Sequence, residues 1–188
     1  MIRSFLVSGL IRQCPLSLGL KNLISHFVGL LKRRVEMLEA LPKFIGQRLL
    51  FTASEVYPGL FQSSKIRTEE DSEFVEDLGV KLVVDLEGGF DPVMNFLDTY
   101  LFWPIHDLPI LPDVDLLVMV CSFIYRQLEL GGKVLVHCSQ GLNRSGLVCG
   151  RVMVMKGMTG VEAIRQIRFK RPGSLWNRVF SKYLESFH

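Results

Sequence analysis

The amino-acid sequence predicts an α/β domain with a central, mostly parallel sheet flanked by helices, and a helical extension at the N-terminus. Short β-branched runs alternate with longer apolar segments of helical spacing across residues 49–188, an order of elements typical of such sheets. Hydrophobic residues make up 48% of the 188-residue chain, which is enough to bury one core. Ligands of parallel sheets bind beyond the carboxyl ends of the strands, so we expect a functional site directly after a strand.

The N-terminal extension is predicted at residues 1–48 as one or two amphipathic helices, because apolar residues recur at helical spacing between Leu20 and Leu31. Residues 1–35 carry six Lys or Arg and no Asp or Glu, so the rest of the chain has a net charge of −3. We expect the apolar stripe to pack on the main domain. The alternative is peripheral membrane contact through residues 1–35. The expected localisation is cytoplasmic, with membrane association or organelle targeting by the N-terminal segment as the alternative.

The first half of the domain alternates strands with one short helix. Thr68 can cap this helix at its start, and Gly79 can end it. A turn at Tyr57-Pro58-Gly59 joins the first two strands. The expected elements, in order, are strands at 49–52 and 59–62, a helix at 68–78, and strands at 81–86 and 100–105.

The second half begins with a strongly apolar helix that Asp113 can cap and that Gly131-Gly132 ends. The run KVLVH is a central strand, and Thr159 with Glu162 has the spacing of a capping box. The expected elements are a helix at 113–130, a strand at 133–137, and helices at 145–156, from 159 to the Pro172-Gly173 pair, and at 174–187.

The segment from His137 to Gly146 carries the chemistry that points to a function. It lies between the strand KVLVH and a helix N-terminus, where backbone N–H groups can surround an anion. Arg144 adds a planar fork that binds two phosphate oxygens at once. We expect phosphate to be bound by the loop residues Ser139, Gln140, Gly141, Leu142, Asn143 and Arg144.

Cys138 is the candidate nucleophile of this loop. The donors that attract phosphate also stabilise a thiolate, and attack on phosphorus would form a phosphocysteine. Ser145 can donate a hydrogen bond to the sulfur as it leaves, while His137 points away and helps to hold the loop. This chemistry needs a free thiol and neither a metal nor an organic cofactor. Cys121 and Cys149 lie in apolar helices and are expected to be buried; a role for either as a redox partner of Cys138 stays open.

His137-Cys138, five residues, and then Arg144-Ser145-Gly146 match the HCx5R(S/T)G signature, and the chain resembles the protein tyrosine phosphatase superfamily. The run 141–146 is similar to the compact dual-specificity branch, especially its bacterial members, and so is the run 171–177. The resemblance covers about Tyr57 to Phe187. It implies a cysteine-phosphatase fold over residues 49–188, and it implies hydrolysis of phosphotyrosine, with phosphoserine and phosphothreonine as further substrates.

The resemblance also implies a general acid, an Asp on a loop before the signature. Asp107 is favoured, because it follows a strand within a proline-rich loop, whereas N-capping already explains Asp113. His106 and Trp103 flank this acid and are expected to be packing residues, with the mouth of the pocket as the alternative. Asp85 is expected to bond loop backbone. Asn177 is either a helix cap or a residue that positions the hydrolytic water.

Three rival functions share parts of this pattern. RNA 5′-triphosphatases of the same superfamily have a similar Gly-x-Asn-Arg loop, but the net charge of −3 outside the N-terminal segment disfavours nucleic acid as a partner. Rhodanese-like sulfur transferases use a cysteine loop without the Asn-Arg-Ser-Gly run. A non-catalytic phosphate-binding module would not need Cys138, Arg144 and Asp107 together. The expected partner is therefore a phosphorylated protein or another phosphomonoester.

Overall fold

The structure is a computed structural model, and it describes residues 51–188. The predictions of a helical extension at residues 1–48 and of membrane contact through residues 1–35 lie outside the described residues. Within residues 51–188, no helix has both the length and the apolar character needed to cross a membrane.

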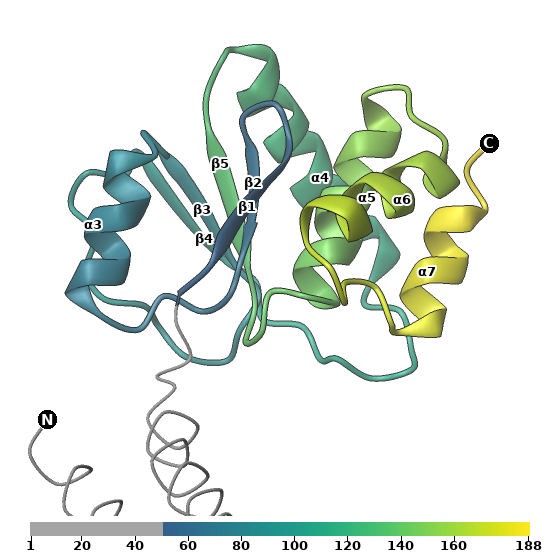
Figure 1. The fold of residues 1–188 in the computed structure, drawn as a ribbon, viewed down its shortest axis with the longest axis horizontal. Helices are drawn as coiled ribbons and strands as arrows, with labels where there is room; N and C mark the ends of the chain where they lie inside the picture. Colours follow the sequence, from purple (N-terminus) through teal and green to yellow (C-terminus); the bar gives the residue numbers. More distant parts are fainter. Residues whose placement is uncertain (1–50) are drawn as a thin grey trace, which may run out of the picture. The chain divides into compact units, whose positions relative to one another are not determined.

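The described residues form a five-stranded sheet in the order β1-β2-β5-β3-β4 (Figure 1). Only β1 runs antiparallel to its neighbour, and the other strand pairs are parallel. The predicted mostly parallel sheet is therefore confirmed, and the carboxyl ends of β2, β5, β3 and β4 share one edge. The strands are β1 (Ala53–Tyr57), β2 (Leu60–Ser63), β3 (Leu82–Asp85), β4 (Thr99–Phe102) and β5 (Val134–His137).

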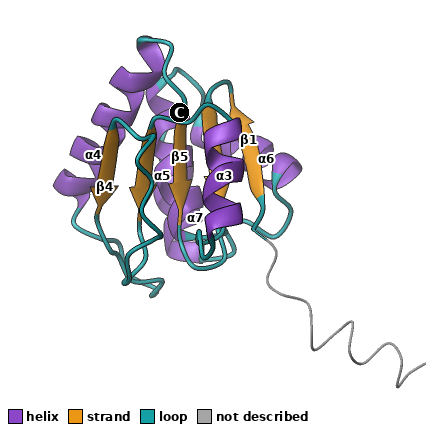
Figure 2. Cartoon of the chain, turned by 90° about the vertical axis from the view of Figure 1, so that its left-hand side faces the viewer, coloured by secondary structure: helices purple, strands orange, loops and turns teal. Residues whose placement is uncertain are grey.

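Helices cover both faces of the sheet (Figures 1 and 2). The short helix α3 packs on one face, and four helices that follow β4 pack on the other. The helices are α3 (Glu69–Asp77), α4 (Val114–Glu129), α5 (Arg144–Met155), α6 (Gly160–Lys170) and α7 (Arg178–Glu185).

The central strand β5 shows why this sheet is buried on both faces. Its residues are fully buried, and neighbouring side chains point to opposite faces. Val134 and Val136 join the core under α4 to α7, while Leu135 joins the smaller core under α3. A strand with such neighbours on both faces is anchored in register, because a slip by one residue would exchange the two cores. Cys138 follows directly after this strand, so the register of β5 sets its position at the sheet edge.

The helix starts follow the capping signals of the sequence. Thr68 and Thr159 each form a capping box, and the Asp113 side chain accepts a hydrogen bond from the Leu116 N–H. Three predictions of element bounds were wrong. The strand expected at 100–105 is β4, and residues 103–105 lie outside it, because Pro104 has no N–H for a ladder hydrogen bond. The first strand begins at Ala53, and neither Phe51 nor Thr52 belongs to it, because pairing with β2 sets its position.

The last helix begins at Arg178 and not at residue 174. Leu175 has a positive φ of 58°, which ends any continuous helix through this segment. The Asn177 side chain then accepts a hydrogen bond from the Val179 N–H and caps α7. The turn at 174–177 places Trp176 and Asn177 next to the loop that follows β5.

Candidate functional site

The loop 138–143 joins the carboxyl end of β5 to the N-terminus of α5, at the sheet edge where a site was predicted. Cys138 is only 2% exposed, yet it lines a cavity of about 220 Å³. The cavity is open to one side and is lined by Asp107, Cys138, Ser139, Gln140, Leu142, Asn143, Arg144 and Trp176. The structure thus brings the predicted nucleophile, the predicted phosphate-binding arginine and the predicted acid to one cavity.

The backbone carbonyls of residues 139–142 in this loop point away from the cavity, and each accepts a hydrogen bond from outside the loop. Their donors are the Lys65 N–H for Ser139 (3.2 Å), Arg171 Nη2 for Gln140 (3.1 Å), Gln62 Nε2 for Gly141 (2.9 Å) and the Leu175 N–H for Leu142 (3.2 Å). In a trans peptide the N–H of the next residue points opposite to the carbonyl. The N–H groups of residues 140–143 therefore face the cavity side, and they add to the positive end of the α5 dipole.

Gly141 allows this loop to lie directly against the end of β2. Its φ is +68°, and a Cβ at this position would lie 2.1 Å from the Ser63 carbonyl oxygen and 2.5 Å from the Ser64 nitrogen. No side chain fits between two backbones at such a distance. Gly141 is not among the residues that line the cavity. It supplies a backbone segment of the loop and has no side chain to offer.

Arg144 reaches across the cavity floor toward the ends of β3 and β4. Its Nη1 donates to the carbonyls of Leu86 and Ile105, both at 3.1 Å, and its Nη2 donates to Glu87 Oε2 at 3.0 Å. Its Nε is buried and has no partner among the described residues. The guanidinium is therefore oriented by three acceptors, while two of its five N–H donors, the Nε–H and one Nη2–H, remain for a ligand.

Glu87 is a site residue that the sequence analysis missed. It follows Asp85 by two positions, at the same sheet edge as Cys138, and it forms an ion pair with Arg144. Its position directly after a buried strand was the available signal.

Asp107 is held at the cavity by two amide side chains. Its Oδ2 accepts from Asn143 Nδ2 at 2.9 Å, and its Oδ1 accepts from Asn177 Nδ2 at 3.0 Å. Asn177 thus both caps α7 and binds Asp107, so the capping interpretation is confirmed. Asp113 is not among the cavity residues, and its carboxylate caps α4.

Ser145 and His137 lie on either side of Cys138 in the structure. The Ser145 Oγ is 3.5 Å from the Cys138 Sγ, close enough for a hydroxyl-to-sulfur hydrogen bond. His137 points away from the cavity, as predicted, and its Nε2 is 2.7 Å from Asp91 Oδ2 and 3.5 Å from Asp85 Oδ1. All three of these ionisable side chains are fully buried, so they tie the start of the loop to the neighbouring strand end.

Asp85 has the structural role that was predicted for it. Its Oδ1 accepts from the Glu87 N–H at 2.7 Å, and its Oδ2 accepts from the Tyr100 hydroxyl at 2.6 Å. Burial raises the pKa of Asp85 above its ordinary value, although the hydrogen bond from Tyr100 and the charge of His137 oppose this. Ligand atoms of Asp85, Asp91 and His137 lie within 4.8 Å of one another, but the contacts among these side chains already account for that closeness.

The other two described cysteines are buried away from the cavity. Burial raises the pKa of Cys121 to about 12, and it raises the pKa of Cys149 well above its ordinary value. Both are free thiols that are poor nucleophiles at neutral pH. Cys138 is thus the cysteine of residues 51–188 that a ligand in the cavity would meet.

Trp176 is a cavity residue to which the sequence analysis assigned no role. Its side chain is 63% exposed at the cavity rim, next to Asn177, which holds Asp107. Trp103 instead packs against the core, as expected, and His106 is exposed and does not line the cavity.

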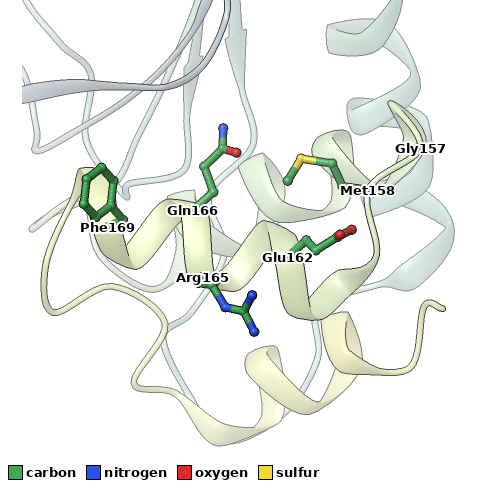
Figure 3. A pocket seen from close by; sticks show the side chains of 6 residues that line it. All are labelled: Gly157, Met158, Glu162, Arg165, Gln166 and Phe169. Carbon is green, nitrogen blue, oxygen red and sulfur yellow. The ribbon is translucent and has the colours of Figure 1, made fainter.

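A second cavity of about 500 Å³ lies along α6 and the turn before it (Figure 3). It contains none of the loop residues 138–144. It is lined by Gly157, Met158, Glu162, Arg165, Gln166 and Phe169.

Comparison with known proteins agrees with this geometry. Residues 60–188 match the family model of the dual specificity phosphatase catalytic domain. Dual specificity protein phosphatase 26 of Homo sapiens and that of Pongo abelii are each 32% identical over 152 residues, which cover 73% of this chain and 71% of the relative.

Solved structures of similar fold include chains at 25% identity or above, among them the following two. Tk-PTP in its active form is 28% identical with a TM-score of 0.59, covering 71% of this chain and 95% of the other. The human tyrosine phosphatase-like serine/threonine/tyrosine-interacting protein is 25% identical with a TM-score of 0.63. The match covers 71% of this chain and 93% of the other. The predicted resemblance is confirmed: this chain belongs to the dual specificity phosphatase family, and it is a protein phosphatase that acts on phosphoproteins.

Proposed function

We propose that this protein phosphatase hydrolyses phosphotyrosine, with phosphoserine and phosphothreonine as further substrates, through a phosphocysteine formed on Cys138. One observation carries the proposal. The Cys138 sulfur, the Arg144 guanidinium and the Asp107 carboxylate meet in one cavity of about 220 Å³, beside a loop whose N–H groups face inward. A phosphate monoester needs a nucleophile, an anion cradle and a proton donor, and the cavity offers one candidate for each.

In the first step, the loop N–H groups and Arg144 bind the phosphoryl oxygens. The unpartnered Nε of Arg144 supplies a donor that no protein acceptor within residues 51–188 takes up. The Cys138 thiolate attacks phosphorus, so an S–P bond forms while the bond to the leaving oxygen breaks. Asp107 in its acid form gives its proton to that oxygen. Each Asp107 oxygen accepts one amide hydrogen in the free site, and each has a second lone pair that can hold the proton.

In the second step, water attacks the phosphocysteine. Asp107, now a carboxylate, takes the proton of this water, and inorganic phosphate leaves as the S–P bond breaks. The departing sulfur regains its negative charge, and the Ser145 hydroxyl can donate a hydrogen bond to it across 3.5 Å. Asn177 has a different role from water positioning in this scheme, because both polar atoms of its amide are already bound.

The rim of the cavity supports the proposed substrate class. Trp176 exposes a large aromatic surface beside Asp107, against which a phenol ring can pack. Arg144 is the only Lys or Arg of the loop 138–144, which favours a simple phosphomonoester over a substrate with many phosphates. Nucleic acid is not proposed as a partner, for the same reason.

Asp107→Asn tests the general-acid role. We expect kcat for a phosphotyrosine peptide to fall by about 10²- to 10⁴-fold, since a positioned proton donor contributes about that factor. Hydrolysis of p-nitrophenyl phosphate should fall much less, because its leaving group departs without a proton. The matched control is Asp113→Asn, which makes the same exchange at a helix cap outside the cavity. Asn caps a helix about as well as Asp, so this variant should keep both its kcat and its free energy of unfolding close to wild type. Equal losses on both substrates would contradict the assignment of Asp107.

Gly141→Ala tests the position of the loop. The added Cβ would meet the Ser63 backbone at 2.1 Å, so the loop must shift, and a shift of about 1 Å costs about 100-fold in kcat/KM. Gly157→Ala is the control, because Gly157 also has a positive φ, of +92°, but no described atom lies within 4 Å of the place that the added methyl group would take. It should lose about 1–2 kcal/mol of stability and keep its activity. A wild-type value of kcat/KM in Gly141→Ala would contradict this prediction, because it would mean that the loop can move without loss of activity.

A further inference from the structure

We propose that Arg171 is a positioning residue of the phosphate site, acting through the loop backbone as a second positive charge behind the Cys138 thiolate and the bound phosphate. The inference rests on the proposed role of Cys138 as the nucleophile. Arg171 does not line the cavity, so it would act without touching the substrate.

The contacts of Arg171 join the loop to the start of the domain. Its Nη2 donates to the Gln140 carbonyl at 3.1 Å, and its Nε donates to the Gly141 carbonyl. On its other side, the guanidinium donates to the carbonyl of Thr52 at 3.1 Å, to the Thr52 hydroxyl at 3.0 Å and to the Ser54 hydroxyl at 3.4 Å. Two consecutive loop peptides are therefore held in orientation by one planar fork, which a more flexible cation would not reproduce.

The charge of Arg171 needs a partner that these contacts do not supply. The residue is only 8% exposed, and it forms no ion pair with any carboxylate of residues 51–188. Burial lowers the pKa of the Arg171 guanidinium, and the negative charge of Cys138 acts in the opposite direction, but an arginine stays protonated in proteins. A buried charge is costly unless an opposite charge is near. Within residues 51–188, the thiolate and the phosphate it attacks are the anions on the far side of these peptides.

The loop peptides carry the effect of this charge to the cavity. The carbonyls of Gln140 and Gly141 accept from the cation, and the N–H groups of the next residues, Gly141 and Leu142, face the other side. A hydrogen bond to a carbonyl polarises its peptide and strengthens the N–H as a donor, by about 10–30% per bond. Arg171 should therefore strengthen the N–H groups that stabilise the thiolate and bind phosphate.

Other ionisable groups also surround Cys138, and a pH experiment must separate them from Arg171. Arg144 and Asp107 face the cavity itself, whereas the remaining groups lie behind the loop or within the core. Two further groups contact the loop or its arginine: Arg67, after β2, donates to the Ser139 carbonyl at 3.4 Å, and Glu87, after β3, pairs with Arg144. By element, the other ionisable groups around Cys138 are His137 of β5 with Asp85 and Asp91, Arg144 and Cys149 of α5, Asp107 of the loop after β4, and Arg171 at the end of α6.

Arg168 offers a matched control on the same helix. It also donates to two backbone carbonyls, those of Ser174 at 3.2 Å and Leu175 at 2.8 Å, and it contacts none of the loop carbonyls of residues 139–143. Arg168→Met therefore removes an arginine fork from the same turn without removing the charge behind the loop.

The test compares the full-length chain with Arg171→Met, Arg171→Lys and Arg168→Met. The first readout is the rate of Cys138 alkylation by iodoacetamide against pH, followed on the Cys138 peptide by mass spectrometry. The second is the inhibition constant of inorganic phosphate, and thermal unfolding checks that each variant is folded. In Arg171→Met, the midpoint of the alkylation profile should move up by about one pH unit, and phosphate inhibition should weaken by about tenfold.

Arg171→Lys keeps the charge and loses the fork. Its alkylation midpoint should move by less than about half a unit, while phosphate inhibition weakens by about threefold or more. Arg168→Met should match the wild type in both readouts. A folded Arg171→Met with a wild-type alkylation profile and wild-type phosphate inhibition would overturn the inference. If that variant does not fold, unchanged phosphate inhibition in Arg171→Lys would overturn it.

The alkylation experiment also separates a failure of the proposed function from a failure of the Arg171 inference. If alkylation of Cys138 in the wild type leaves activity intact, the role of Cys138 as nucleophile is wrong, whatever the Arg171 variants do. If alkylation of the wild type abolishes activity but the Arg171 variants behave as wild type, only the role of Arg171 is wrong.

Discussion

Cys138→Ser should lower kcat for a phosphotyrosine peptide by about four orders of magnitude or more. A serine hydroxyl ionises far less readily than a thiol, so the loop donors that stabilise a thiolate would face a neutral, poorly nucleophilic oxygen. The loop N–H groups and Arg144 remain in this variant, so we expect inorganic phosphate and the substrate to bind nearly as well as in the wild type. Single-turnover kinetics and phosphate inhibition measure the two properties separately.

The matched control for this experiment is Cys149→Ser. Cys149 lies in α5 as a fully buried thiol outside the cavity, so its replacement should affect stability and leave kcat close to wild type. The same assay with 5′-triphosphorylated RNA should give little turnover by the wild type. Wild-type turnover of the phosphotyrosine peptide by Cys138→Ser would refute the covalent mechanism, and preferred turnover of the RNA would redirect the substrate assignment.

Arg144→Lys has the second largest expected effect, a fall in kcat/KM of about 10²- to 10³-fold. Lysine keeps the positive charge but lacks the fork that binds two phosphate oxygens at once. It also cannot reproduce the bonds to Leu86, Ile105 and Glu87 that orient the guanidinium. Both kcat and KM should therefore deteriorate, which steady-state kinetics with a phosphotyrosine peptide would measure.

Arg151→Lys provides the control for Arg144→Lys, because it makes the same exchange on the same helix. The Arg151 guanidinium lies 4.5 Å from the centre of the Phe187 ring, away from the cavity residues. It should keep wild-type kcat and KM and lose a small part of the stability. Equal kinetic losses in both variants would mean that α5 as a whole, and not the fork at Arg144, responds to the exchange.

The position of the site could be predicted because its determinants are close together in the chain. The spacing of Cys138 and Arg144, the β-branched run before them and the helix after them lie within about twenty residues, and local geometry converts such spacing into a cradle. The caps at Thr68, Asp113 and Thr159 were predictable for the same reason, since each bonds to a residue three positions on.

The groups that orient the site could not be predicted, because they come from distant parts of the chain. Glu87 meets Arg144 across 57 positions, and Asn177 meets Asp107 across 70. No periodicity or capping rule relates such pairs, and only the sheet order brings them together. The start of β1 was missed on similar grounds, since pairing with β2 decides its register and its own residues have weak strand preference.

The double attachment of Asp107 has a consequence for how this enzyme becomes ready to react. One of its two amide partners, Asn143, belongs to the phosphate-binding loop, and the other, Asn177, begins α7. A rearrangement that distorts the loop therefore also breaks one of the two bonds that hold the acid, so the loop and the acid should become ordered together. Substrate binding would then not need to close a separate lid. The geometry already present in the empty enzyme would account for a large part of the rate enhancement.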